Sequence, residues 1–132
     1  MAVFFRKIQR NDPRNPGGVK KWYIILKSLG TRRTKEITQR MADETTLNPK
    51  EAEIGLYEFV KVLKATLKEG YTAQIDDLGT FYLTVNSSAS ETEAEANARN
   101  CTGIHIRFRP DEAFQKEMDH IRLKPLDELS AK

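Results

Sequence analysis

Apolar residues alternate with charged and polar ones over the first 27 residues of the chain. They recur with a period of two at Val3 and Phe5 and again over residues 22–26, which predicts two half-buried β-strands. Between them, residues 11–18 are dense in Asn, Asp, Pro and Gly and cannot continue a strand. The chain is therefore expected to open with a β-hairpin that has a long connecting loop.

Two helices are predicted next. The first is expected to begin at Thr34, whose hydroxyl can cap the free backbone amides of the first turn. Asn48, Pro49 and Glu51 have the spacing of an N-cap, a first-turn proline and a capping box, and so open the second helix. This helix is expected to end near Gly70.

The second predicted helix has a wide apolar stripe. One face holds apolar residues from Ala52 to Leu67, and Ile54, Tyr57 and Val62 widen the stripe beyond what a single short helix buries. A second packing partner is implied. Another subunit is the simplest candidate for this partner, and the alternative is that the strands of the same chain cover the stripe.

The pattern then returns to a period of two. Residues 73–75 and 80–85 predict two strands, joined by a turn at Asp76 and Asp77, and Gly79 marks a tight bend. Residues 86–99 are small, polar and acidic, which predicts a flexible excursion from a strand pair. The excursion returns as a strand over residues 104–108.

A last amphipathic helix is expected to begin at Pro110, with Phe114, Met118 and Ile121 on one face. The residues that follow show no periodicity. We therefore expect a basic β-extension over residues 1–33, one α+β domain over 34–123 and a loose tail over 124–132.

Charge is distributed unevenly along the chain. Residues 1–35 hold ten Lys and Arg against the single acid Asp12, whereas residues 36–132 hold twelve against eighteen Asp and Glu. The first segment is a candidate surface for a polyanion. From charge alone, a solvated strand face fits equally well.

Four short motifs occur in a fixed order after the hairpin: Thr34-Lys35-Glu36-Ile37, Leu67-Lys68-Glu69-Gly70, Leu78-Gly79-Thr80-Phe81 and Phe108-Arg109-Pro110. Each resembles the corresponding segment of the HU/IHF family of histone-like DNA-binding proteins. The resemblance covers about residues 34–121. The preceding basic hairpin is similar to that of HU-related variants, mostly bacterial, that carry an N-terminal extension.

The resemblance implies an HU/IHF-like intertwined homodimer. Its expected fold has two N-terminal helices, a three-stranded antiparallel sheet with an extended β-arm and a C-terminal helix, with the N-terminal β-hairpin added. The implied function is nucleoid-associated, non-sequence-specific binding and condensation of double-stranded DNA, and HU and IHF bend DNA with apolar wedges in the minor groove. Affinity would come from Lys and Arg that neutralise phosphates.

The arm departs from the family pattern. The family's arm is rich in arginine and ends in an Arg-Asn-Pro tip, whereas this segment carries Glu91, Glu93 and Glu95 against one Arg99. Arg99-Asn100-Cys101 resembles that tip with cysteine in place of proline, with coincidence an equal alternative. Carboxylates beside phosphates repel by about 1 kcal/mol per close pair in a water-like dielectric. Weaker DNA bending than in standard members is therefore expected.

Other cations are predicted to contact phosphates instead. Arg107 and Arg109 lie on the returning strand, and Arg32, Arg33 and Lys35 cluster where the first helix begins. Ordinary solvated surface charge is the alternative for all of them. These five residues and Arg99 together form the predicted DNA-binding set.

No residue constellation indicates catalysis. His105, His120 and the lone Cys101 lack partners at a spacing typical of a nucleophilic or metal site. We expect no enzyme activity, metal, cofactor or small-molecule substrate. The longest apolar run is far shorter than the roughly 20 residues of a membrane span and no secretory leader is evident, so we expect a cytoplasmic protein that binds no membrane.

Two functions remain open from the sequence. The first is DNA binding by the homodimer through the strand pair and the basic N-terminal segment. The second is a protein-interaction scaffold that keeps an HU-like dimer without DNA bending. The acidic arm favours the scaffold, and the basic segment with Arg107 and Arg109 favours DNA binding.

Overall fold

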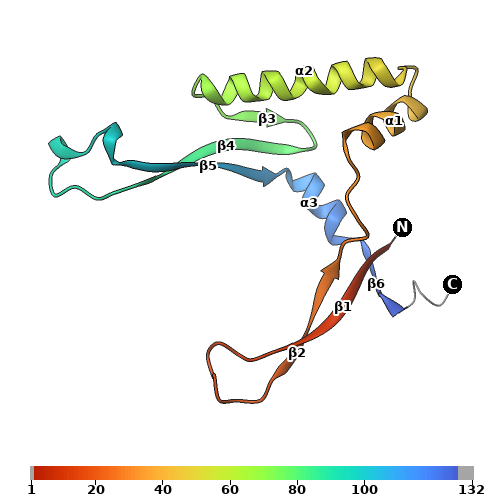
Figure 1. The fold of residues 1–132 in the computed structure, drawn as a ribbon, viewed down its shortest axis with the longest axis horizontal. Helices are drawn as coiled ribbons and strands as arrows, with labels where there is room; N and C mark the ends of the chain where they lie inside the picture. The colour runs from red at the N-terminus through yellow and green to blue at the C-terminus, as the bar shows by residue number, and fades with distance from the viewer. Residues whose placement is uncertain (1, 128–132) are drawn as a thin grey trace. The chain divides into compact units, whose positions relative to one another are not determined.

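The computed structural model describes residues 2–127. Strands and helices alternate in groups along the chain (Figure 1), in the order β1 (Ala2–Arg10), β2 (Lys21–Lys27), α1 (Thr34–Glu44), α2 (Pro49–Lys68), β3 (Ala73–Ile75), β4 (Gly79–Ser87), β5 (Cys101–Pro110), α3 (Glu112–Asp119) and β6 (Arg122–Pro125). Two short 3-10 turns, Glu93–Glu95 and Ala98–Asn100, lie between β4 and β5.

The chain divides into two compact units. We call residues 33–116 the central unit, and residues 1–32 together with 117–132 the terminal unit. The division falls within α3, so each unit contains part of this helix.

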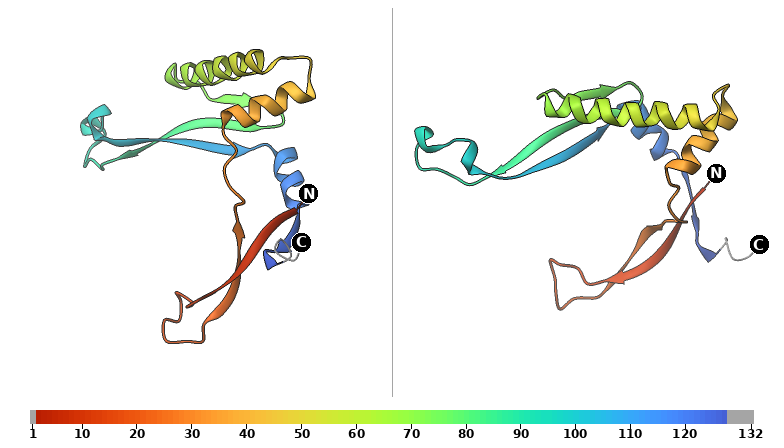
Figure 2. Two further views of the ribbon diagram at one scale, coloured as in Figure 1. Left: turned by 45° about the vertical axis from the view of Figure 1, so that its right-hand side comes forward. Right: turned by 45° about the horizontal axis from the view of Figure 1, so that its top comes forward.

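The central unit combines helices α1 and α2 with an antiparallel sheet of order β3-β4-β5. Helix α2 lies along β3 and β4, and the β4–β5 pair continues beyond the end of the helix as an arm (Figure 2). The predicted strands at residues 73–75 and 80–85 are confirmed within β3 and β4. The predicted return at 104–108 lies within β5.

Helix α2 begins as its sequence predicts. The Asn48 side chain accepts a hydrogen bond from the Glu51 amide at 2.8 Å and donates one to the Glu51 carboxylate at 2.8 Å, and Pro49 occupies the first turn. Helix α1 starts at Thr34 as expected, but its N-cap is Arg33 and makes no side-chain capping bond. The predicted cap by Thr34 is therefore wrong.

The last helix begins later than predicted. Pro110 ends β5, where it pairs with Gly79, and α3 starts at Glu112. The Asp111 amide donates to the Leu78 carbonyl at 3.0 Å, which ties the start of α3 to the turn before β4. Ile121 lies beyond the end of α3, so the predicted apolar stripe of this helix is shorter than expected.

The two ends of the chain form a second sheet, of order β2-β1-β6. Strand β1 pairs antiparallel with β2, as the predicted hairpin requires, and parallel with β6. The Leu126 amide extends this pairing by donating to the Phe5 carbonyl at 2.9 Å. Lys124 and Pro125, which the sequence analysis assigns to a loose tail, thus lie in β6, and residues 128–132 of that tail lie outside the described residues.

The predicted HU/IHF-like fold is wrong for this chain. Residues 2–127 form three helices and two three-stranded sheets, strands precede the first helix, and α3 is followed by a strand instead of being the last element. The physical reason is that β6 completes a sheet with β1 from the opposite end of the chain. Such long-range pairing leaves no local periodicity in a strand of four residues.

A single chain buries little of its apolar surface. The buried apolar residues among those described are Ala52, Leu67 and Ala73, all in the central unit, and Thr38 is the buried polar one. Several large side chains on α2 and on the β4–β5 pair stay exposed, with Ile106 at 72%. Full burial of each such side chain would contribute about 1.5–3 kcal/mol to the free energy of unfolding. The central unit therefore exposes an apolar surface that a packing partner could cover.

Candidate functional site

The β4–β5 pair sorts its side chains onto two chemically different faces. Residues that pair directly across antiparallel strands point to the same side of the sheet. By the register, one side, which we call the polar face, carries Gln74, Thr80, Tyr82, Thr84, Asn86, His105, Arg107 and Arg109. None of these eight is acidic. The other side is apolar, with Phe81 and Phe108 directly opposite each other and their ring centroids 4.8 Å apart.

Arg107 and Arg109 lie on this polar face and are both exposed. They are two residues apart on one strand, so their Cα atoms are separated by about 6.5 Å. Neither has an ion-pair partner among residues 2–127. The Arg107 Nε donates to the Thr84 hydroxyl at 3.4 Å. Guanidinium groups with free donors on an acid-free face are suited to hydrogen-bond with anions such as carboxylates and phosphates.

Neighbouring polar side chains add hydrogen-bonding capacity to the polar face. The Asn86 amide nitrogen and His105 Nε2 lie 2.7 Å apart, and Tyr82 pairs across from Arg107. Tyr82, Thr84, Asn86 and His105 are not among the DNA-binding residues predicted from the sequence. Their alternation with apolar residues was the available signal, but the register of β4 with β5 is needed to place them beside the arginines.

The other predicted DNA-binding residues are distributed over the chain. Arg33 and Lys35 lie together at the start of α1, both exposed. Arg32 is the last residue of the first segment of the terminal unit. Arg99 lies in the second 3-10 turn of the arm. The structure thus brings Arg107 and Arg109 onto one face and places Arg33 beside Lys35.

The end of the arm is a closed loop built around Asn100. The side-chain Nδ2 of Asn100 donates to the Ser88 carbonyl at 3.1 Å and to the Ser90 hydroxyl at 2.8 Å. Its Oδ1 accepts from the backbone amide of Asn97 at 2.9 Å. The Ser88 amide donates to the Asn100 carbonyl at 2.8 Å. The segment that resembles a family tip therefore lies where the loop closes onto β5, away from the loop's middle.

Acidic side chains occupy the middle of this loop. Glu91, Glu93 and Glu95 are all exposed, and the last two lie in the first 3-10 turn. The arm therefore presents carboxylates where a minor-groove wedge would need apolar or cationic groups.

Within residues 2–127, no three His, Cys, Asp or Glu side chains come together as ligands for a metal ion. Cys101 is an exposed free thiol. Over the same residues, no helix combines the length and the apolar character that a membrane crossing requires.

A family profile described as "HU domain fused to wHTH, Ig, or Glycine-rich motif" (HU-HIG) matches residues 1–125, and so includes the N-terminal strands. No curated protein sequence matches the chain. A solved structure, of a proposed bacterial DNA-binding protein from Bacteroides vulgatus, matches with a TM-score of 0.70 and 13% identity. The match covers 95% of this chain and 48% of that chain. At this identity the likeness shows a common fold, and this chain spans about half the length of that protein.

Proposed function

The chain belongs to the HU-HIG family, and on that basis we propose that it is a non-enzymatic, architectural DNA-binding protein. It acts as a homodimer on double-stranded DNA, without sequence specificity, at the nucleoid in the bacterial cytoplasm. The observation that carries this proposal is the acid-free polar face of β4 and β5 with the exposed Arg107 and Arg109. The Bacteroides protein of similar fold, itself proposed to bind DNA, supports the same class of function.

The mechanism rests on phosphate neutralisation. Each Lys or Arg that contacts a phosphate releases condensed counterions, and binding therefore weakens steeply with salt. Arg107 and Arg109 contact the backbone from the polar face, and the basic N-terminal segment adds further contacts. Contacts of this kind position a protein on a duplex but carry no direct sequence information.

The arm limits how strongly the protein bends DNA. Exposed Glu91, Glu93 and Glu95 repel phosphates, and the hydrogen bonds of Asn100 hold the loop closed. Deep insertion into the minor groove is disfavoured on both grounds. We therefore propose binding with weaker bending than in standard HU-like proteins.

The second candidate function is a protein-interaction scaffold that has lost DNA bending. The acidic loop of the arm favours it, because exposed carboxylates suit a basic protein partner better than a nucleic acid. Binding to duplex DNA separates the two functions.

The double variant Arg107→Gln/Arg109→Gln tests the proposed surface. With a labelled short duplex in an anisotropy titration, we expect Kd to rise about tenfold or more and the log-log salt slope to fall by about two for each contacting protomer. The loss should be the same for duplexes of different sequence, because the contacts reach only the backbone.

The matched control is Arg40→Gln/Lys116→Gln. It removes the same charge from two exposed cations that pair with Glu44 and Glu112 along their own helices. We expect it to change Kd by less than about threefold. Equal losses in the two variants would show that net charge, and not the polar face, governs binding. A wild-type protein that binds no duplex would support the scaffold instead.

A further inference from the structure

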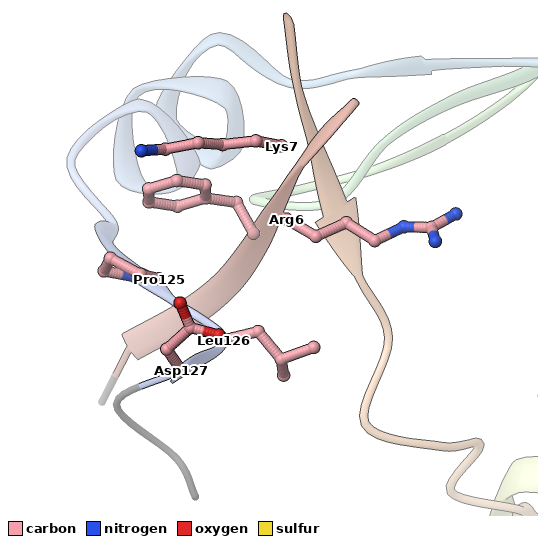
Figure 3. A pocket seen from close by; sticks show the side chains of 6 residues that line it. Arg6, Lys7, Pro125, Leu126 and Asp127 are labelled. Atoms are coloured by element: carbon pink, nitrogen blue, oxygen red, sulfur yellow. The ribbon is translucent and has the colours of Figure 1, made fainter. Parts of the chain in front are cut away.

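The terminal sheet sorts its cations onto one face. Strands β1, β2 and β6 contain no acidic residue and seven Lys or Arg. The register places six of the seven on the same side, which we call the basic face: Arg6, Arg10, Lys21, Lys27, Arg122 and Lys124. The seventh, Lys7, points the other way, and Figure 3 shows the Arg6 and Lys7 side chains leaving β1 in opposite directions.

Two like charges face each other directly on the basic face. Arg10 and Lys21 are a cross-strand pair, with strands about 4.8 Å apart. Like charges in this position destabilise a strand pair, and no acid within the sheet offsets them. An anion bound between them would remove the repulsion.

Strand β6 completes a second part of the basic face. Phe4 pairs with Lys27 on one side and with Lys124 on the other, so a half-buried aromatic ring lies between two cations. Arg122, beside Ala2, extends this edge. The cations of β6 come from the far end of the chain, which is why the charge count of residues 1–35 does not include them.

A shallow hollow lies at the loop end of the basic face. It has a volume of about 170 Å³ and is lined by Arg10, Asn11, Pro13 and Tyr23. A guanidinium, an amide and a flat exposed ring are groups that contact phosphate and sugar. Near the opposite end, Asp127 follows β6 and lines another hollow with Arg6 and Lys7 (Figure 3). Six cations on the sheet thus outnumber the two acids next to it in the chain, Asp12 in the loop after β1 and Asp127 after β6.

The opposite face of the same sheet is apolar. Trp22, Ile24 and Leu26 share it with Lys7, and Trp22 is 67% exposed. Six of the seven cations of the terminal sheet therefore share the basic face with Phe4, Ile8, Tyr23 and Ile25, whereas the apolar face carries one cation.

We propose that the basic face of the β2-β1-β6 sheet is a second binding surface for the phosphate backbone of duplex DNA, completed by the C-terminal strand β6. This inference deepens the proposed function and rests on it, and it adds contacts on the terminal unit to those of the polar face on the central unit. Each protomer then engages DNA through both of its units.

The variant Arg6→Gln/Arg122→Gln removes one cation from β1 and one from β6. In the full chain, we expect the duplex Kd to rise about tenfold. The slope of log Kd against the logarithm of salt concentration should decrease by about two for each contacting protomer. Lys27→Gln alone should lower the slope by about one and serves if the double variant does not fold. Circular dichroism melts establish folding for each variant.

Two controls test whether the face that carries a cation matters. Lys7→Gln removes a neighbouring cation of β1 from the apolar face and should leave Kd within about threefold. The swap Gln9→Arg/Arg10→Gln preserves composition and net charge but moves a guanidinium off the basic face, and it should weaken binding as Arg10→Gln does. Equal effects of Arg6→Gln and Lys7→Gln, or wild-type binding by the swap, would overturn the proposal.

A comparison with the polar face separates the two proposals. If Arg107→Gln/Arg109→Gln weakens binding and Arg6→Gln/Arg122→Gln does not, the terminal surface is wrong and DNA binding through the polar face stands. If wild-type protein binds phosphatidylserine vesicles through the basic face but no duplex, both proposals fail and the partner is an anionic membrane. We expect weaker duplex binding by both variants and no vesicle binding by the wild-type protein.

Discussion

Gly79→Ala is expected to destabilise the protein by about 3 kcal/mol. Gly79 is buried at the start of β4 and has φ = +150°, a region that residues with a Cβ rarely adopt. An added Cβ would collide with the Arg109 carbonyl oxygen and would lie 2.7 Å from Cε2 of Phe108. Because both are parts of the paired β5, the strand pair cannot move aside without losing its register. Urea unfolding followed by circular dichroism measures the change.

Two other glycines separate the effect of the positive φ angle from the effect of the steric clash on the loss of stability. Gly70 has φ = +92° but no atom within 4 Å of an added Cβ, so Gly70→Ala should cost only about 1 kcal/mol. Gly55 lies within α2 and also has no atom within 4 Å, so Gly55→Ala should stabilise by about 0.5–1 kcal/mol. If Gly79→Ala and Gly70→Ala unfold at the same urea concentration, the close approach of β5 is not what requires glycine.

Ile106→Asp is expected to abolish the proposed homodimer. Ile106 is 72% exposed on the apolar face of β5, beside Ile104 and opposite Leu83. If a second copy covers this face, an aspartate there is buried without a partner, and the dimer Kd should rise about a hundredfold or more. Sedimentation velocity at micromolar concentration should give twice the chain mass for wild type and the mass of one chain for the variant. The wild-type melting temperature should also rise with protein concentration.

The matched substitution for the dimer is Thr84→Asp. Thr84 lies in the neighbouring strand on the polar face, so its replacement adds the same charge on the side that we propose contacts DNA. It should remain dimeric and bind duplex more weakly. Wild-type protein that sediments as a single chain at micromolar concentration would contradict the dimer.

Local signals in the sequence predicted the central unit well. The Asn48-Pro49-Glu51 spacing placed the start of α2, and the alternation over residues 80–85 placed β4. These features depend on residues within one or two turns of each other. The polar face could be anticipated in part, because Arg107 and Arg109 are two residues apart in a predicted strand, whereas their neighbours across the sheet required the register.

The terminal unit could not be predicted in the same way. Strand β6 is four residues long, ends in proline and pairs in parallel with β1 from the other end of the chain. The sequence around β6 shows neither an alternating apolar pattern nor the strand with which β6 pairs. The basic charge of the N-terminal segment was visible, but its sorting onto one face depends on which residues pair. The resemblance to HU and IHF also suggested a chain closed by a helix, and β6 overturned that order.

We propose above that this chain binds duplex DNA through phosphate contacts. The most direct test is the Kd of the wild-type protein for a short duplex at several salt concentrations from about 50 to 200 mM. We predict that the logarithm of Kd rises linearly with the logarithm of salt concentration, with a slope of about 4 or steeper, since each phosphate contact contributes roughly 0.9 and each of two polar faces would contribute two arginines. No measurable binding at about 50 mM salt, or an affinity that does not change with salt, would show that the protein does not bind duplex DNA through phosphate contacts.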